Sequence, residues 1–163
     1  METKRKKRLL NAVMVILILI IAACGVLAAG SIRGWFDTGT ESWITSGHVS
    51  GVASIERNGI GYSLQDGQGI KDGDVIETKQ GSTASLQLGK SNTIVLNENT
   101  ELTVTSADAE AVELSVGRGE LFADIPKAGK SFVLKLDEHE AKIGDSVFSA
   151  SVQTGSVTFD VYM

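Results

Sequence analysis

Apolar and polar residues alternate in short stretches along the chain from residue 47 onward. In a β-strand this period of two places one face in the core and the other in water. Seven stretches carry the pattern, and their apolar positions outline a predicted core: Ala84, Leu86 and Leu88; Leu102 and Val104; Val112, Leu114 and Val116; Leu121, Ala123 and Ile125; Phe132, Leu134 and Leu136; Phe148, Ala150 and Val152; and Val157, Phe159 and Val161. No apolar stripe of helical period extends beyond about two turns, so the sequence predicts an all-β domain over residues 47–163.

Clusters of Gly, Asp, Asn and Ser separate these stretches and predict tight turns. The predicted turns are Asn58-Gly59, Asp66-Gly67, Asp72-Gly73, Lys90-Ser91-Asn92, Gly117-Arg118-Gly119 and Glu138-His139-Glu140. An isolated open sheet would leave one apolar face in water, so regularly spaced strands favour two packed layers or a coiled stack. The sequence therefore predicts an antiparallel sandwich of jelly-roll type or a short β-solenoid.

The amino-terminal residues predict a membrane anchor. Residues 1–8 form a basic head whose cationic side chains are Lys4, Arg5, Lys6, Lys7 and Arg8. The apolar run that follows, residues 9–29, is roughly 31 Å long as a helix, which is enough to cross the ~30 Å hydrocarbon core of a bilayer. Because basic residues stay on the cytoplasmic side, we expect a single-pass signal-anchor helix in a bacterial cytoplasmic membrane, with the amino terminus inside and the β domain outside. Residues 30–46 then form a tether or a first edge strand.

Two processing alternatives to a retained anchor remain open. Ile21-Ala22-Ala23-Cys24 is similar to the box of bacterial lipoproteins, in which the cysteine is acylated after cleavage, and Ala28 with Gly30 satisfies the rule for ordinary signal cleavage. The apolar run extends past both, which favours retention. All three interpretations place the β domain outside the cytoplasm. Trp35, Phe36 and Trp43 fit either the outer membrane interface or packing on the domain.

Charge and residue supply exclude several classes of function. The net charge is −5, and residues 31–163 hold ten basic and nineteen acidic residues, a net of −9, so we expect no nucleic-acid partner. The single cysteine permits no internal disulfide. His48 and His139 are the only histidines, and no Gly-x-Ser-x-Gly, P-loop or HExxH sequence occurs. The sequence therefore predicts no enzyme activity, no cofactor and no metal site.

One acidic stretch has a composition that could suggest a calcium loop. Residues 66–74 carry three carboxylates in nine residues. Counted from Asp66, the fifth position of an EF-hand series is Ile70, which offers no side-chain oxygen. Consecutive Gly-Asp turns are the interpretation that the spacing favours.

Several segments occur in an order that resembles a known family. Four of them are residues 51–57, Leu64 with Gly69, residues 71–78 and residues 81–88; later ones are residues 92–96, 100–104, 114–121, 132–134 and 141–144 with Phe148. Together they resemble the FecR domain family over residues 47–163, although Asp145-Ser146-Val147 replaces its usual Gly-Thr-x-Phe element. The positions that carry the motif, each also explained by a local turn or core position, are Gly51, Gly69, Gly73, Asp74, Ile76, Thr78, Gly119, Gly144 and Phe148.

The resemblance implies an extracytoplasmic β module that contacts another envelope protein or an envelope polymer. In the family's best-known branch such a module is joined to an intracellular anti-sigma segment, but eight head residues are too few to fold a sigma-binding domain. We expect a non-enzymatic interaction or signalling domain held at the lipid bilayer. The alternatives are a carbohydrate-binding or cell-wall-binding module, for which Tyr62 is a candidate contact, and a lipoprotein carrying the same domain. The terminal run 157–162 either closes the module or belongs to a longer protein, and the oligomeric state is not encoded in any motif.

Overall fold

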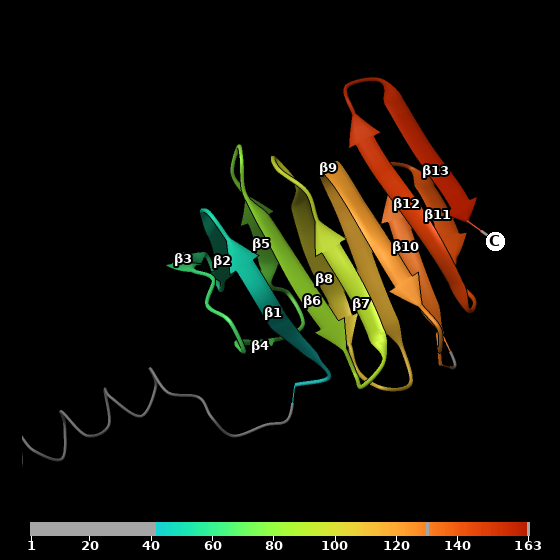
Figure 1. Ribbon diagram of the computed structural model, residues 1–163, viewed down its shortest axis with the longest axis horizontal. Coiled ribbons are helices and arrows are strands. Elements are labelled where there is room, and N and C mark those ends of the chain that lie inside the picture. Colours follow the sequence, from blue (N-terminus) through green and yellow to red (C-terminus); the bar gives the residue numbers. More distant parts are fainter. Residues whose placement is uncertain (1–41, 130, 163) are drawn as a thin grey trace, which may run out of the picture. The chain divides into compact units, whose positions relative to one another are not determined.

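A computed structural model describes residues 42–129 and 131–162, which lie in one compact unit, Glu41–Met163. The described residues contain strands and no helix (Figure 1). The strands are β1 (Ile44–Ser50), β2 (Ala53–Arg57), β3 (Ile60–Ser63), β4 (Gly69–Ile70), β5 (Val75–Thr78), β6 (Thr83–Leu88), β7 (Asn92–Leu96), β8 (Glu101–Ala107), β9 (Val112–Ile125), β10 (Phe132–Leu136), β11 (His139–Lys142), β12 (Ser146–Gln153) and β13 (Ser156–Tyr162).

The predicted membrane helix, the basic head and Cys24 lie outside the described residues. Within residues 42–129 and 131–162, no helix has the length and hydropathy needed to span a bilayer.

The strands form one curled, mostly antiparallel sheet that turns at β9 (Figure 1). The first half of β9 pairs antiparallel with β8 and parallel with β10, and its second half pairs antiparallel with β7 and β12. The pairing register with β8 shifts between Val116 and Arg118, and Gly119 has a φ of +93°. A strand can bend sharply where a glycine permits positive φ. One continuous strand thus belongs to both faces of the curled sheet.

The concave side of the sheet holds the core, and most of the predicted core is confirmed. Six of the seven predicted apolar sets are buried, together with residues that the pattern did not single out, such as Ile44, Ile55 and Ile94. The seventh set is different, because Phe159 is 37% and Val161 54% exposed. Their alternation is correct, but the opposite part of the sheet does not extend over β13 there. The prediction that this set is core is therefore wrong.

The all-β prediction is confirmed, while some boundaries differ. Residues 112–125 were expected as two strands around a turn at residues 117–119, but they form the single strand β9. The domain was expected to start at residue 47, yet β1 begins at Ile44, whose side chain is fully buried. Trp43 packs against the core beside Gly89, so packing on the domain is the correct interpretation for this tryptophan. Trp35 and Phe36 lie outside the described residues.

Three of the six predicted turns are confirmed in full, and a fourth, Lys90-Ser91-Asn92, is confirmed in part because Asn92 already begins β7. Asn58-Gly59, Asp66-Gly67 and Asp72-Gly73 are turns, and each of their glycines has positive φ. The turn between β10 and β11 is formed by Asp137 and Glu138, with Asp137 at a φ of 55°. His139 and Glu140, expected in this turn, instead begin β11.

Candidate interaction surface

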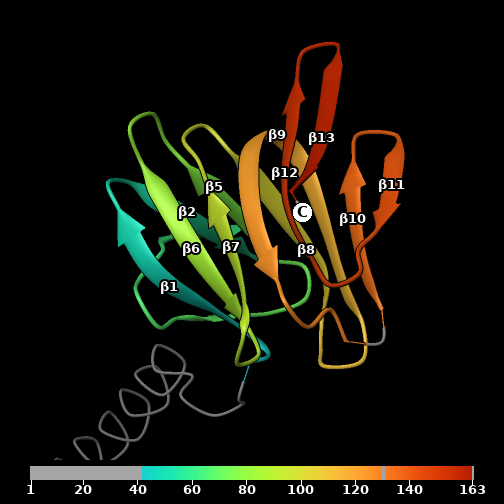
Figure 2. The same cartoon turned by 45° about the vertical axis from the view of Figure 1, so that its right-hand side comes forward.

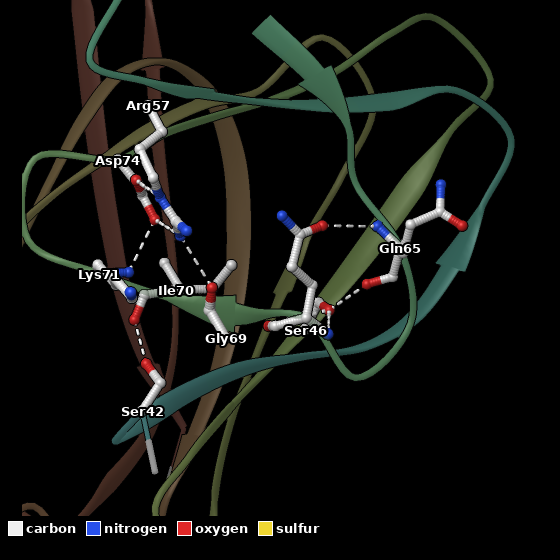
Figure 3. Close-up of polar contacts among 9 residues, drawn as sticks. Ser42, Ser46, Arg57, Gln65, Gly69, Ile70, Lys71 and Asp74 are labelled. Atoms are coloured by element: carbon white, nitrogen blue, oxygen red, sulfur yellow. Dashed lines mark hydrogen bonds and ion pairs between the residues drawn. The ribbon is translucent and has the colours of Figure 1, made fainter. Parts of the chain in front are cut away.

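The family-motif residue Asp74 lies at the centre of a buried polar link (Figure 3). Its carboxylate accepts hydrogen bonds from Arg57 Nε at 2.8 Å and Arg57 Nη2 at 2.6 Å, and from the backbone N–H of Lys71 at 2.7 Å. Arg57 Nη2 also donates to the carbonyl of Gly69 at 2.9 Å. A bidentate, charge-assisted pair of this kind fixes both geometry and register. Asp74 therefore joins β2, β4 and the turn before β5.

A second motif residue, Thr78, connects the end of β5 to the turn before β8. Thr78 is fully buried, and its hydroxyl accepts the N–H of Thr100 at 3.0 Å while its own N–H donates to the carbonyl of Thr100 at 2.9 Å. The Thr100 hydroxyl donates to the carbonyl of Glu120 at 2.9 Å. A Cβ on Gly119 would lie 2.4 Å from Thr100 Cα. These contacts hold the bend of β9 against β5 and β8.

All but one of the remaining motif positions have a structural role, and the exception is Gly144. Gly51 has a φ of +82°, and a Cβ there would lie 2.4 Å from the Ser82 hydroxyl oxygen. Gly69 lies in β4 close to Ser42, whose hydroxyl donates to the Ile70 carbonyl (Figure 3). Gly73 lies in a turn, and Ile76 and Phe148 lie in the core. Gly144 has no positive φ, and no neighbouring atom lies within 4 Å of the position that its Cβ would occupy.

The carboxylates of the acidic stretch bond to three separate partners. Asp66 Oδ1 accepts the N–H of Val49 at 2.8 Å, Asp72 Oδ1 accepts the N–H of Ala107 at 2.8 Å, and Asp74 pairs with Arg57. Within the described ranges, no group of three or more His, Cys, Asp or Glu side chains has the arrangement of a metal site. Each aspartate instead ties its turn to a neighbouring strand.

Surface ion pairs shift two pKa values. A hydrogen bond from Lys79, with the nearby charges of Lys79 and Arg118, lowers the pKa of Glu77 despite an opposing effect of burial. A hydrogen bond and ion pair with Glu113 raise the pKa of Lys135. Both pairs lie across neighbouring strands or near the ends of strands, where exposed ion pairs contribute little to stability. The shifts are those of ordinary surface pairs and mark no acid–base chemistry.

A partly exposed apolar cluster lies on the outer face of the sheet, across β7, β9, β12 and β13. We call it the outer patch and define it as Val95, Phe122, Val147 and Tyr162; the two valines are half-buried and lie opposite the two aromatic residues in the pairing register. Phe122 and Tyr162 are 42% and 52% exposed, and their ring centroids lie 6.1 Å apart. The Tyr162 hydroxyl is hydrogen-bonded to the Ser149 hydroxyl at 3.0 Å. Exposed aromatic side chains that are already held in place lose little entropy on binding, and they are enriched in protein interfaces.

Two other surface features offer less. Val52, Ile60 and Tyr62 are exposed on β3 and beside β2, at one end of the strand order, whereas β12 and β13 join the sheet at β9. An open groove of about 670 Å³ lies among the loops that precede β6, β8 and β13 and the bend of β9. Polar groups on its wall already bond one another, as Asn97 Nδ2 does to Glu120 Oε2 at 2.9 Å.

Comparison with known proteins identifies the class. The family described as FecR protein matches residues 74–163, more than half of the chain, and the chain therefore belongs to this family. FecR domains are associated with signalling at the cell envelope, and the family is generally non-catalytic. No curated protein and no solved structure matches the chain. The matched range starts at Asp74, whereas the sequence resemblance began at residue 47.

Sequence reasoning missed the outer patch because it followed the buried phase of each strand. Phe122 and Tyr162 occupy positions that the alternation assigns to the solvent-facing side of their strands. Phe122 lies between the buried Leu121 and Ala123, and Tyr162 follows Val161. An aromatic residue at a position that the alternation assigns to water was the available signal.

Proposed function

We propose that this chain is a membrane-anchored FecR module that contacts an envelope protein outside the cytoplasm and performs no chemistry itself. The basic head and the apolar run of residues 9–29 support the anchor, and the net charge of −9 beyond residue 30 supports an external domain that avoids nucleic acid. The family's association with envelope signalling supports the role.

The outer patch is the observation that carries this proposal. Two aromatic rings in contact stabilise the sheet modestly while they remain in water, and a partner that covers them gains a rigid apolar anchor in addition. The acidic side chains beside it, Asp124 and Asp160, lie next to Val147 and Ser149 in the pairing register. They favour a partner with apolar and cationic side chains.

A carbohydrate-binding module remains the alternative, with less support. Glycan-binding sandwiches commonly line a concave face with aromatic rings, but here aliphatic core residues fill the concave side. Tyr62 lies on β3, in a different part of the strand order from Phe122 and Tyr162.

Crosslinking of the full chain in its own envelope tests the proposal. We expect a specific crosslinked partner that disappears in Phe122→Ser/Tyr162→Ser and persists in the matched control Ile60→Ser/Tyr62→Ser, which changes similarly exposed side chains on β3. An equal loss in both variants, or in neither, would contradict the assignment to the outer patch. Pelleting with cell-wall polysaccharide that weakens in Tyr62→Ala would favour the alternative function.

A further inference from the structure

The free edges of the sheet differ in how well they are protected. Among the described strands, β3, β4, β11 and β13 have a neighbour on one side only. β4 has two residues, β3 has four with a central glycine, and β11 carries a Glu and a Lys in its four residues. β13 is longer: its seven residues all pair with β12, without a bulge and without Lys, Arg or Pro. Proteins normally avoid such an edge because another strand can add to it.

The hairpin geometry determines which backbone groups of β13 point to this edge. The two-residue turn Thr154-Gly155 makes Gln153 and Ser156 a hydrogen-bonded pair, and hydrogen-bonded pairs alternate along an antiparallel ladder. The even-numbered residues of β13 therefore bond to β12. The N–H and C=O groups of Val157, Phe159 and Val161 point to the free edge.

The side chains of the same three residues form an apolar strip on the core side of the sheet. They lie opposite Phe148, Ala150 and Val152 of β12, which are buried. The ring of Phe159 contacts that of Phe148 with centroids 5.0 Å apart, yet Phe159 and Val161 remain exposed.

The hairpins β10–β11 and β12–β13 lie at the same end of the unit (Figure 2). Between their tips is a groove of about 510 Å³, lined by Leu136, Ala141, Val157 and Phe159 and by the polar side chains of Asp137, His139 and Glu140. The core thus opens to solvent along β13.

We propose that β13 pairs antiparallel with β13 of a second copy of this chain, about a two-fold axis that passes beside Phe159. In this register Phe159 lies opposite its symmetry mate, and Val157 lies opposite Val161 of the second copy. These are the three residues whose N–H and C=O groups point to the free edge, so they form the hydrogen-bonded pairs of the new ladder. All seven residues of β13 find a partner, and the apolar strips of the two copies lie side by side, where each shields part of the other from water. A symmetric interface of this kind closes on itself and leaves no free edge at β13.

The sequence of β13 favours this register over its neighbours. A shift that centres the axis on Asp160 would set two carboxylates directly opposite each other, which is unfavourable. A shift that centres it on Thr158 would set Val161 opposite Gly155 and lose pairs at the end. In the proposed register Asp160 lies opposite Thr158, and the two Asp160 side chains are diagonal neighbours about 7–8 Å apart. This residual repulsion is screened at physiological salt, so we expect association to strengthen as salt rises.

Disulfide crosslinking tests the register directly. Thr158→Cys and Asp160→Cys are made separately in the full chain with Cys24→Ser, kept in neutral detergent because of residues 9–29. Directly opposite residues in a non-hydrogen-bonded pair have Cα atoms about 4.5 Å apart, within disulfide range, whereas diagonal residues exceed it. We expect a crosslinked dimer when the two variants are mixed and little with either alone. Crosslinking that is equal alone and mixed, or absent throughout, overturns the proposal; Tyr62→Cys on β3 measures random collision.

Sedimentation equilibrium of the full chain in density-matched detergent provides an independent measurement. We expect Val161→Lys, which changes an exposed side chain, to weaken dimerisation at least tenfold. Thr158→Lys, which sets a cation opposite Asp160 twice, should tighten it about three- to tenfold. A chain that stays monomeric at all concentrations overturns the proposal. So would a basic, apolar peptide that binds a monomer in the groove between the hairpins β10–β11 and β12–β13. These outcomes are independent of the outer-patch partner, because they need no other protein.

Discussion

At the scale of single residues, the motif positions act by satisfying buried polar groups. Asp74 is fully buried, and it is paired with Arg57, which is partly exposed. Such a pair adds little net stability when intact, but removal of one member is costly because the other loses a bidentate, charge-assisted partner. The charge of Asp74 is tolerated inside a small core because its carboxylate accepts three hydrogen bonds, two of them from Arg57.

We therefore expect Asp74→Ala to lower the free energy of unfolding by about 3 kcal/mol, near the lower end of the range for broken buried pairs because Arg57 reaches solvent. The exposed turn residue Glu138 is the matched control, and Glu138→Ala should change it by less than about 0.5 kcal/mol. Urea unfolding followed by fluorescence measures both. Equal effects of the two substitutions would show that the Arg57–Asp74 pair does not organise the fold.

Two motif glycines should respond in opposite ways to the same substitution. Gly119→Ala forces a side chain into positive φ and within 2.4 Å of the Thr100 backbone, so we expect a loss of about 3 kcal/mol or more. Gly144 has no positive φ, and no neighbouring atom lies within 4 Å of the position that its Cβ would occupy, so Gly144→Ala should be neutral or stabilise by about 0.5 kcal/mol. Thermal unfolding compares them. A tolerated Gly119→Ala would contradict the bend of β9.

At the scale of elements, the period of two predicted the strands well, because it reports which side chains share a face. It could not predict what covers that face. Phe148 and Phe159 occupy equivalent phases of β12 and β13, yet one is fully buried and the other 37% exposed. Burial depends on the opposite part of the sheet, which is set by pairing between distant segments. The bend in β9 could not be predicted for a related reason. Gly117 and Gly119 have the composition of a turn, so the sequence predicts two strands there, but pairing with distant strands keeps residues 112–125 as one bent strand.

The same pair of phenylalanines provides a test of this difference. Phe148→Ala should cost about 3–5 kcal/mol, as expected for a large side chain removed from a packed core. Phe159→Ala should cost less than half as much, because much of its ring is already in water. Urea unfolding at low protein concentration gives both values for the single chain. Equal costs would mean that the side chain of Phe159 is covered in the monomer, which would contradict an exposed apolar strip on β13.

At the scale of the whole molecule, the start of β1 defines the smallest chain that should fold alone. The Gly89 N–H donates to the Trp43 carbonyl at 2.8 Å, and the side chain of Ile44 is fully buried. Residues 41–163 should therefore give a β-type circular dichroism spectrum and melt cooperatively. A chain that begins at residue 47, the boundary predicted from sequence, should melt several degrees lower, because it lacks Trp43 and Ile44. Identical melting of the two chains would show that these residues contribute nothing to the unit.

The topology proposed from the basic head is tested on the intact protein. In a Cys24→Ser background, Glu138→Cys places a thiol at an exposed turn of the β unit, and Lys4→Cys places one in the head. Because basic residues resist transfer across the membrane, a membrane-impermeant maleimide added to spheroplasts should label the first variant at once. It should label the second only after lysis. The reverse order would put the β unit in the cytoplasm, and the envelope role with its partner on the outer patch would then fail. With Cys24 intact, a protein that begins at acylated Cys24, or a released protein that begins at residue 31, would keep the external location but replace the anchor.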